Sequence, residues 1–179
     1  MDGAQRGCMG ARFRVKDDAR KQDEEACTVS TNGRDVVFEP EITVFVCNYC
    51  GYMSADTAGA LRLQYPPNIK VVRLPCTGKT DIGYILKAFE QGADGVYIVG
   101  CSLGNCHHVR GNERGRARVE RAKQILDAIG LGSERLEMFF VSGGMGATFA
   151  RYAEEMTQRI RTLGPNPLRT APVGGAETH

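Results

Sequence analysis

The sequence lacks a marked excess of charge and a long apolar run, and we expect no secretory leader. Its 179 residues include 23 Lys and Arg against 21 Asp and Glu, so no strong field points to nucleic acid or a membrane surface as the main partner. No apolar run approaches the roughly 20 residues that span a bilayer, and the N-terminal stretch has no continuous apolar segment of the secretory kind. We therefore expect a cytoplasmic protein, in a compartment that keeps thiols reduced.

The sequence also lacks a recognisable catalytic set. No Ser-His-Asp combination or acid/base carboxylate pair stands out, and nothing nominates a substrate pocket. The stretch "CTGKTD" is not a P-loop, because Arg73 stands where that motif needs a glycine. The stretch "SGGMGATF" lacks a full G-x-G-x-x-G, so we interpret it as a close turn that packs the last helix, with a nucleotide site as the less favoured alternative. These absences favour an electron carrier over an enzyme that turns over a substrate alone.

Strand-like and helix-like segments alternate through the middle of the chain. Runs rich in β-branched and aromatic residues predict four strands, "EITVFVC", "NIKVVRLPC", "DGVYIVGC" and "RLEMFFVSGG". This alternation predicts an α/β fold, a small doubly wound and mainly parallel four-stranded sheet with helices on both faces. We assign residues 39–164 to this domain, 1–38 to a flexible N-terminal extension and 165–179 to a disordered C-terminal tail.

Capping residues and apolar stripes predict where the helices begin and end. We expect Ser54 to cap the first helix, which ends before the prolines at 66–67, and Thr80 to cap the second, which Gly92 closes. The three clearest stripes are Ile82, Ile85, Leu86 and Phe89; Val119, Ala122, Leu126 and Ile129; and Phe149, Tyr152, Met156, Ile160 and Leu163.

Five cysteines follow the ends of the predicted strands. Cys47 ends the first strand, Cys76 the second and Cys101 the third, while Cys50 and Cys106 lie a few residues further on. Because parallel strands end at the same edge of a sheet, we expect the five thiols to converge there. Cysteines that merely pack as small apolar residues would lie inside strands, and the strand interiors contain none. The pattern therefore favours metal or redox chemistry over packing.

Three kinds of site remain open for these thiols. The C-x-x-C motif of Cys47 and Cys50 can chelate one iron or zinc, and "CSLGNC" adds a C-x4-C motif. A [2Fe–2S] cluster needs four thiolates, which would leave one of the five spare. Structural zinc comes second, since it usually uses two well-formed paired motifs, and a thioredoxin-like dithiol comes third, since it leaves three thiols without a role. Cys8 and Cys27 lie in the extension, and we take them as incidental.

Groups beside the thiols can tune an anionic cluster. Lys79, His107 and His108 lie close to them in sequence, and backbone amides of nearby glycines could donate hydrogen bonds. These glycines are Gly51, Gly78 and Gly104. The histidines lack a Rieske-like pattern, so we interpret them as solvent-facing loop residues. The basic stretch "HHVRGNERGRARVERAK" is interpreted as a solvated helix face, or as a docking surface for an acidic partner.

Four stretches resemble the delta subunit of methyl-viologen-reducing hydrogenase. They are "CNYC" after an apolar strand, "LQYPPNIKVVRLPCTGK", "LKAFEQGADGVYIVGCSLGNCHH" and "RVERAKQILDAIGL", and the resemblance covers about residues 40–163. It implies a non-catalytic electron-transfer subunit of an oxidoreductase complex. Such a protein would relay electrons from a hydrogenase or formate dehydrogenase to a heterodisulfide reductase A-type flavoprotein.

The resemblance also implies a cofactor, a [2Fe–2S] cluster held by four of five cysteines. They are Cys47, Cys50, Cys76, Cys101 and Cys106, the same five that the predicted topology brings together. No nucleic acid partner and no membrane insertion are expected. The alternative is a zinc-stabilised protein that bridges larger subunits and has no redox role.

Overall fold

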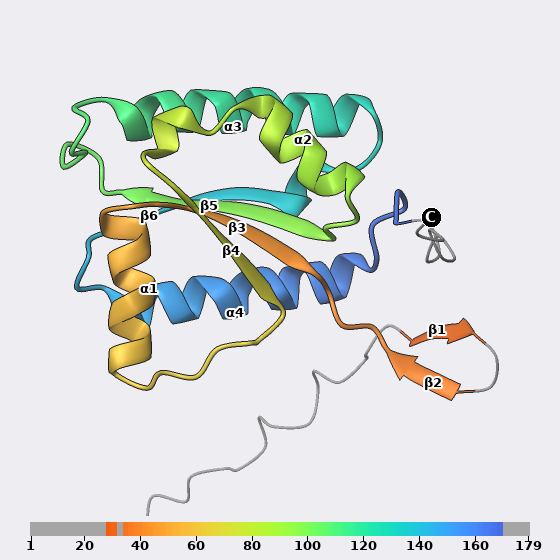
Figure 1. Ribbon diagram of the computed structural model, residues 1–179. Coiled ribbons are helices and arrows are strands. Elements are labelled where there is room, and N and C mark those ends of the chain that lie inside the picture. The colour runs from red at the N-terminus through yellow and green to blue at the C-terminus, as the bar shows by residue number, and fades with distance from the viewer. Residues whose placement is uncertain (1–27, 32–33, 170–179) are drawn as a thin grey trace, which may run out of the picture.

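A four-stranded parallel sheet forms the centre of the computed structural model, which describes residues 28–31 and 34–169 (Figure 1). The strands lie in the order β4-β3-β5-β6, and every neighbouring pair is parallel. Their bounds are β3 (Ile42–Cys47), β4 (Ile69–Leu74), β5 (Gly95–Cys101) and β6 (Leu136–Val141). This confirms the predicted α/β class. Because the chain order reverses beside β3, the point between β3 and β5 is the topological switch point of the sheet.

Helices cover both faces of the sheet (Figure 1). One face carries α1 (Cys50–Ala60) and α4 (Gly146–Leu163), and the other carries α2 (Ile82–Glu90) and α3 (Gly111–Ala128). Two short 3-10 turns, η1 (Thr77–Lys79) and η2 (Ser133–Arg135), complete the connections. Strand β5 is buried along its whole length, since helices pack on both of its sides. A two-sided core of this kind explains the near-continuous apolar sequence of β5.

Two helices begin differently from the prediction. Helix α1 starts at the second cysteine of the C-x-x-C motif, and Ser54 lies buried inside it, where its hydroxyl donates to the Gly51 carbonyl at 2.7 Å. The Gly51 N–H instead donates to the Cys47 sulfur, so a thiol takes the place of a capping hydroxyl. Helix α2 is capped by Asp81, whose carboxylate accepts a backbone N–H of the first turn. Thr80, the predicted cap, is buried immediately before it.

The helix ends follow the prediction more closely. Gly92 closes α2 with φ +95°, a left-handed conformation that glycine adopts without strain. Two members of the predicted apolar stripes are exposed, and both lie at the C-terminal ends of their helices. Ile129 is 59% exposed after α3, and Leu163 is 40% exposed in the last turn of α4.

The two terminal regions contain structure that the sequence did not predict. Strands β1 (Thr28–Thr31) and β2 (Arg34–Val37) pair as an antiparallel hairpin within the segment assigned to the extension. At the other end, Asn166 is buried and donates its side-chain amide to the Phe89 and Ala93 carbonyls, at 3.0 and 2.8 Å. Residues 165–169 are therefore anchored to the domain. Residues 1–27, 32–33 and 170–179 lie outside the described part, where the extension and tail stay predictions.

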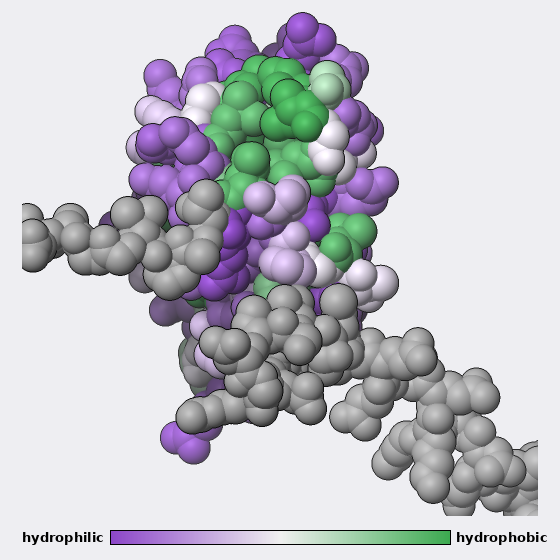
Figure 2. All heavy atoms as spheres, turned by 90° about the vertical axis from the view of Figure 1, so that its right-hand side faces the viewer, coloured by the Kyte–Doolittle hydropathy of each residue, from purple (hydrophilic) through white to green (hydrophobic). Residues whose placement is uncertain are grey.

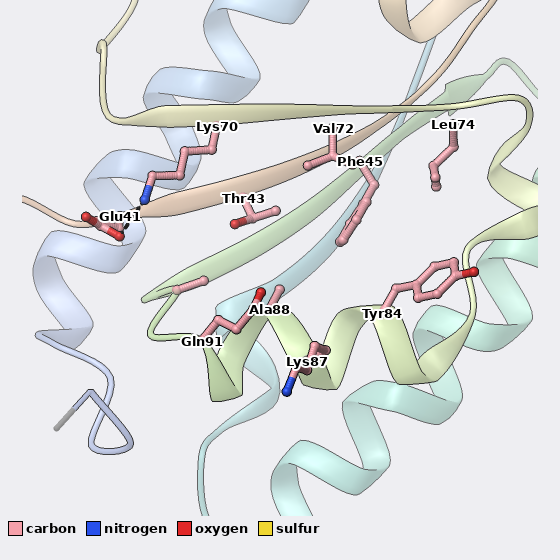
Figure 3. Close-up of a pocket in the computed structure, with 11 residues that line it drawn as sticks. Glu41, Thr43, Phe45, Lys70, Val72, Leu74, Tyr84, Lys87, Ala88 and Gln91 are labelled. Carbon is pink, nitrogen blue, oxygen red and sulfur yellow. Dashed lines mark hydrogen bonds and ion pairs between the residues drawn. The ribbon is translucent and has the colours of Figure 1, made fainter. Parts of the chain in front are cut away.

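The edge strand β4 is covered less completely than the sequence predicted. Val71 is 44% exposed and Val72 38%, and they face opposite sides of the sheet, so the helices on both faces leave this margin partly uncovered. A groove of about 560 Å³ lies between β4 and α2, where Phe45, Val72 and Tyr84 line it and the Lys70–Glu41 ion pair, 2.8 Å long, lies at one end (Figure 3). The residues that line it include no cysteine. No helix in residues 28–31 and 34–169 is both long and apolar enough to cross a bilayer.

Candidate metal centre

Two buried thiols meet at the switch point of the sheet. Cys47 ends β3 and Cys101 ends β5, and these strands are neighbours. Their sulfur atoms lie 3.6 Å apart, and the residues are only 1% and 3% exposed. The carboxyl edge at a switch point is where open α/β sheets bind their ligands.

The second strand delivers its thiol through a turn. Strand β4 ends at Leu74, and Cys76 lies two residues later as the cap of η1, so the predicted position at the strand end was wrong. The turn carries Cys76 toward Cys106. A Cβ atom added to Gly111, the first residue of α3, would collide with the Cys76 sulfur and lie 3.1 Å from that of Cys106. The bare backbone of Gly111 therefore lets both sulfurs approach the start of α3.

The five thiols form two adjacent groups. In the first, the thiol triad, the Cys47 and Cys101 sulfurs lie 3.6 Å apart, and the Cys50 sulfur lies within 4.8 Å of that of Cys101. In the second, the thiol pair, Cys76 lies close enough to Cys106 for the two thiols to interact, and it also interacts with the charge of Cys101. The structure thus brings together the five cysteines that the sequence singled out, from three strand ends and two loops.

Backbone N–H groups point at these sulfurs from the starts of several elements. The Gly51 N–H at the start of α1 donates to Cys47 at 3.1 Å, and the Gly78 N–H of η1 donates to Cys76 at 3.4 Å. The backbone of residues 108, 111 and 112, around the start of α3, lowers the pKa of Cys106, and the backbone of Gly143 opposes the rise in the pKa of Cys50. Helix N-termini carry partial positive charge and stabilise anions. The donor set therefore fits an anionic metal–thiolate group.

Two of the three glycines expected to donate do so. Gly51 and Gly78 contact the thiols as predicted. Gly104 instead takes φ +82° in the loop after β5, and no described hydrogen bond joins its N–H to a sulfur. Gly143, which the sequence did not nominate, takes part in its place.

The environment makes most of these thiols hard to ionise. Burial raises the pKa of Cys47 to about 12 and raises the pKa of Cys50 and Cys76 as well. Burial alone would also raise the pKa of Cys106, but the N–H donors of α3 hold it below its usual value. A redox dithiol needs a lowered pKa in its C-x-x-C motif, which this motif does not have. A metal ion supplies the positive charge that holds buried thiols as thiolates.

His107 lies closer to the thiols than the sequence suggested. It is exposed, as expected, and its ring stacks on Tyr49 with centroids 4.0 Å apart and planes 7° from parallel. A ring nitrogen of His107 and the sulfurs of Cys50 and Cys101 all lie within 4.8 Å of one another. The interpretation as a merely solvent-facing residue was therefore incomplete.

Two polar residues that the sequence did not single out hold the site together. Asn112 is 1% exposed, and its amide donates to the Cys101 and Ser102 carbonyls, both at 2.9 Å. Arg118 is half-buried and donates to the carbonyls of Gly78 and Thr80, at 2.5 and 3.2 Å, which fixes the turn that carries Cys76. Both occur within a basic stretch that is typical of a solvated helix face, so the sequence offered no signal for either.

The glycine-rich turn after β6 packs the last helix, as interpreted from the sequence. A Cβ atom at Gly146 would lie 2.7 Å from the Ala58 backbone nitrogen, so glycine permits the close contact of α4 with α1. The Thr57 hydroxyl donates to the Gly143 carbonyl at 2.9 Å in the same turn. This contact sets Gly143 beside Cys50, and the turn thereby takes part in the thiol site.

Known proteins resemble this chain over most of its length. The family model described as methyl-viologen-reducing hydrogenase, delta subunit, matches residues 42–164. The D-type vhu iron-sulfur subunit of an F420-non-reducing hydrogenase from Methanococcus maripaludis is 49% identical over 73% of this chain and 98% of its own length. The counterpart from Methanocaldococcus jannaschii is 48% identical over the same shares. The A-type subunit of a ferredoxin/F(420)H(2)-dependent CoB-CoM heterodisulfide reductase from Methanosarcina acetivorans is 35% identical over 70% of this chain and 16% of its own length. The chain thus belongs to the methyl-viologen-reducing hydrogenase delta-subunit family.

Proposed function

We propose that this chain is an electron-transfer subunit and that four of its five converging thiols hold a [2Fe–2S] cluster. The observation that carries the proposal is the meeting of five thiols at the switch point, with backbone N–H groups that donate to Cys47 and Cys76 and backbone groups that lower the pKa of Cys106. When bound, the cluster supplies a one-electron couple between ferric and ferrous iron. The chain holds it near the surface, where the redox centre of a partner can approach.

We assign the ligands from the two groups of thiols. Cys76 and Cys106 form one set, and two members of the thiol triad form the other. Two sulfurs on one tetrahedral metal with bonds of about 2.3 Å lie about 3.7 Å apart. The Cys47 and Cys101 sulfurs, at 3.6 Å, match this separation. Cys50 is then the fifth thiol, beside His107.

The surrounding residues tune this centre. Each N–H donor disperses negative charge from sulfur and favours the reduced, more anionic state, which raises the reduction potential. Asn112 and Arg118 hold the thiol-bearing segments in place through backbone carbonyls. The exposed stack of Tyr49 on His107 lies between the thiols and solvent, on the side from which a partner would approach.

The partners follow from the relatives. Several are named as iron-sulfur subunits of a hydrogenase, which supports a hydrogenase as the electron donor, with a formate dehydrogenase as the other candidate. Others are named as the A-type subunit of heterodisulfide reductase and contain a stretch like this chain, which supports an A-type flavoprotein as the acceptor. A cytoplasmic location suits this role because reduced thiols are needed to assemble the centre.

One observation favours a second candidate, a zinc-stabilised bridging protein with no redox role. Cys50, Cys101 and His107 place ligand atoms within 4.8 Å of one another, and the Cys47 sulfur is 3.6 Å from that of Cys101. Three thiolates and one imidazole are a common set for structural zinc. This candidate leaves the thiol pair without a metal.

Metal and sulfide analysis separates the two candidates. The full chain is purified without oxygen, and iron, zinc and acid-labile sulfide are measured, followed by EPR after dithionite reduction. We expect about two iron and two sulfide per chain and a signal in the reduced state. Replacing Cys8 and Cys27 by serine serves as the control and should leave all of these values unchanged. One zinc per chain without sulfide would contradict the cluster and support the bridging role.

A further inference from the structure

Large apolar side chains are exposed around the thiols. This set, the apolar collar, comes from the segments that leave β3, β5 and β6. Its members are Tyr49, Tyr52, Met53, Leu103, Val109 and Met145, each between 36% and 80% exposed. Exposed apolar patches on soluble domains often mark interaction sites. We therefore expect a partner protein to cover the apolar collar.

Contacts between the segments make the collar continuous. Tyr49, after β3, stacks on His107 in the loop after β5. Met53, in the first turns of α1, lies against Gly143 in the loop after β6, where even an added Cβ atom would come within 3.0 Å of its methyl group. The three segments thus join into one surface over the thiols.

Two features of Val109 are energetically unfavourable in the isolated chain, the exposure of its side chain and its backbone conformation. It is 80% exposed, the most of the large apolar residues described. Its φ is +63°, a left-handed conformation that β-branched residues avoid. Its N–H donates to the Cys106 carbonyl at 2.9 Å, so the bend closes the loop that carries that thiol. Glycine or asparagine would close the same bend with less strain, which implies that the valine side chain itself serves a purpose outside the isolated chain.

The charges around the collar are mostly positive. The four segments at this edge are residues 47–53, 73–80, 102–114 and 142–147, and they hold four Lys or Arg and one Glu. Arg73 lies over the Tyr52 ring at 4.8 Å, which places a cation directly beside the apolar surface. The single carboxylate, Glu113, is paired with Arg110 at 2.7 Å. The surface therefore complements an apolar patch with an acidic border.

We propose that the apolar collar is the docking face for the heterodisulfide reductase A-type flavoprotein, with Val109 as its anchor. This inference rests on the proposed function. Heterodisulfide reductase relatives that carry a similar stretch within their own longer chain support that partner over the hydrogenase. The described ends of the chain lie at the opposite end of the strands from the collar (Figure 1). A similar domain within a longer chain would therefore leave the collar exposed.

A second apolar surface lies far from the thiols. Figure 2 shows hydrophobic side chains gathered over the ends of α2 and α3. Ile129 and Leu168 line a groove there and are 59% and 50% exposed. Helix α3 runs from the thiol pair toward this surface over 18 residues, about 27 Å. A partner seated there would be too remote to exchange electrons with the thiols, so this surface supplies a matched control.

The test uses Val109→Asn and Val109→Gly in the full chain, purified without oxygen and carrying its metal. Both variants keep the bend and remove the apolar group. We expect each to melt at a higher temperature than the parent chain, with unchanged iron content and EPR spectrum. We expect the Kd for the purified A-type flavoprotein to rise at least tenfold. Ile129→Asn makes the same chemical change at the far surface and should leave this Kd within twofold.

Three outcomes would overturn the proposal. In the first, both Val109 variants bind with unchanged Kd although their iron content is normal. In the second, Ile129→Asn weakens binding more than Val109→Asn does, which would move the docking face to the far surface. In the third, the Kd of the parent chain does not rise between 50 and 500 mM salt, a range chosen to screen the basic border. Absence of iron from the parent chain would instead contradict the proposed function.

Discussion

Gly111→Ala is the substitution that most directly perturbs the thiol site. The new Cβ atom would collide with the Cys76 sulfur and lie 3.1 Å from that of Cys106. Relief requires the Cys76 sulfur or the start of α3 to move by about 1 Å, whereas metal–ligand distances tolerate only about 0.2 Å. Overpacking of this kind costs about 1–3 kcal/mol in a rigid site. We therefore expect the chain to fold but to lose most of its iron.

The assay is iron and sulfide content together with the visible circular dichroism of the anaerobic protein. We expect the Gly111→Ala chain to hold less than a quarter of the parent iron. Gly59→Ala is the matched control, because Gly59 also lies in a helix and an added Cβ atom meets nothing within 4 Å. It should keep its iron and gain about 0.5–1 kcal/mol in free energy of unfolding. Full iron and an unchanged spectrum in Gly111→Ala would refute the reasoning.

Three further predictions concern the thiols and their supports. Cys76→Ser should abolish the EPR signal while Cys50→Ser retains most of it, and the reverse order would contradict the ligand assignment. Arg118→Ala removes the donor to two carbonyls of the Cys76 turn and should at least halve the iron content. Arg121→Ala, on the exposed face of the same helix, is the control and should leave the iron content unchanged. Equal losses of iron in the two variants would refute the role of Arg118. Burial raises the pKa of Cys47 from 9.0 to about 12, so this thiol stabilises the metal-free chain below pH 9 and loses that contribution as pH rises toward 12. Urea unfolding at pH 8 and 10.5 should show lower stability at 10.5, and equal or higher stability there would contradict it.

The sheet and the meeting of the thiols could be predicted because each depends on a strong local pattern. The unbroken apolar run of β5 predicts a strand covered on both faces, and the structure confirms this. Once the strands are parallel, Cys47 and Cys101 must end at the same edge. The positions of the cysteines relative to the predicted strand ends were therefore enough to predict that the thiols meet.

The remaining features depend on contacts between distant segments. Ser54 has the chemistry of a helix cap, but the Cys47 sulfur accepts the Gly51 N–H and lets α1 begin earlier. The proximity of Cys76 to Cys106 depends on the missing side chain of Gly111, which no local pattern reveals. His107 approaches the thiols only through the loop geometry after β5. The local sequence preferences of these residues could not have predicted any of these three contacts.

The groove beside β4 also escaped prediction, for a related reason. Its apolar walls belong to a strand and a helix that each have an ordinary sequence pattern. The opening exists because α2 packs against β5 and leaves Val72 of β4 partly exposed. The position of a covering helix across its sheet is a property of the whole domain.

In the proposed site, sulfur atoms from distant segments surround one iron–sulfur centre. Iron K-edge X-ray absorption of the anaerobic full-length protein tests this most directly. We predict a first shell of sulfur alone at about 2.3 Å and a second iron close by. A protein without iron, whose zinc edge shows three sulfurs and one nitrogen, would contradict it.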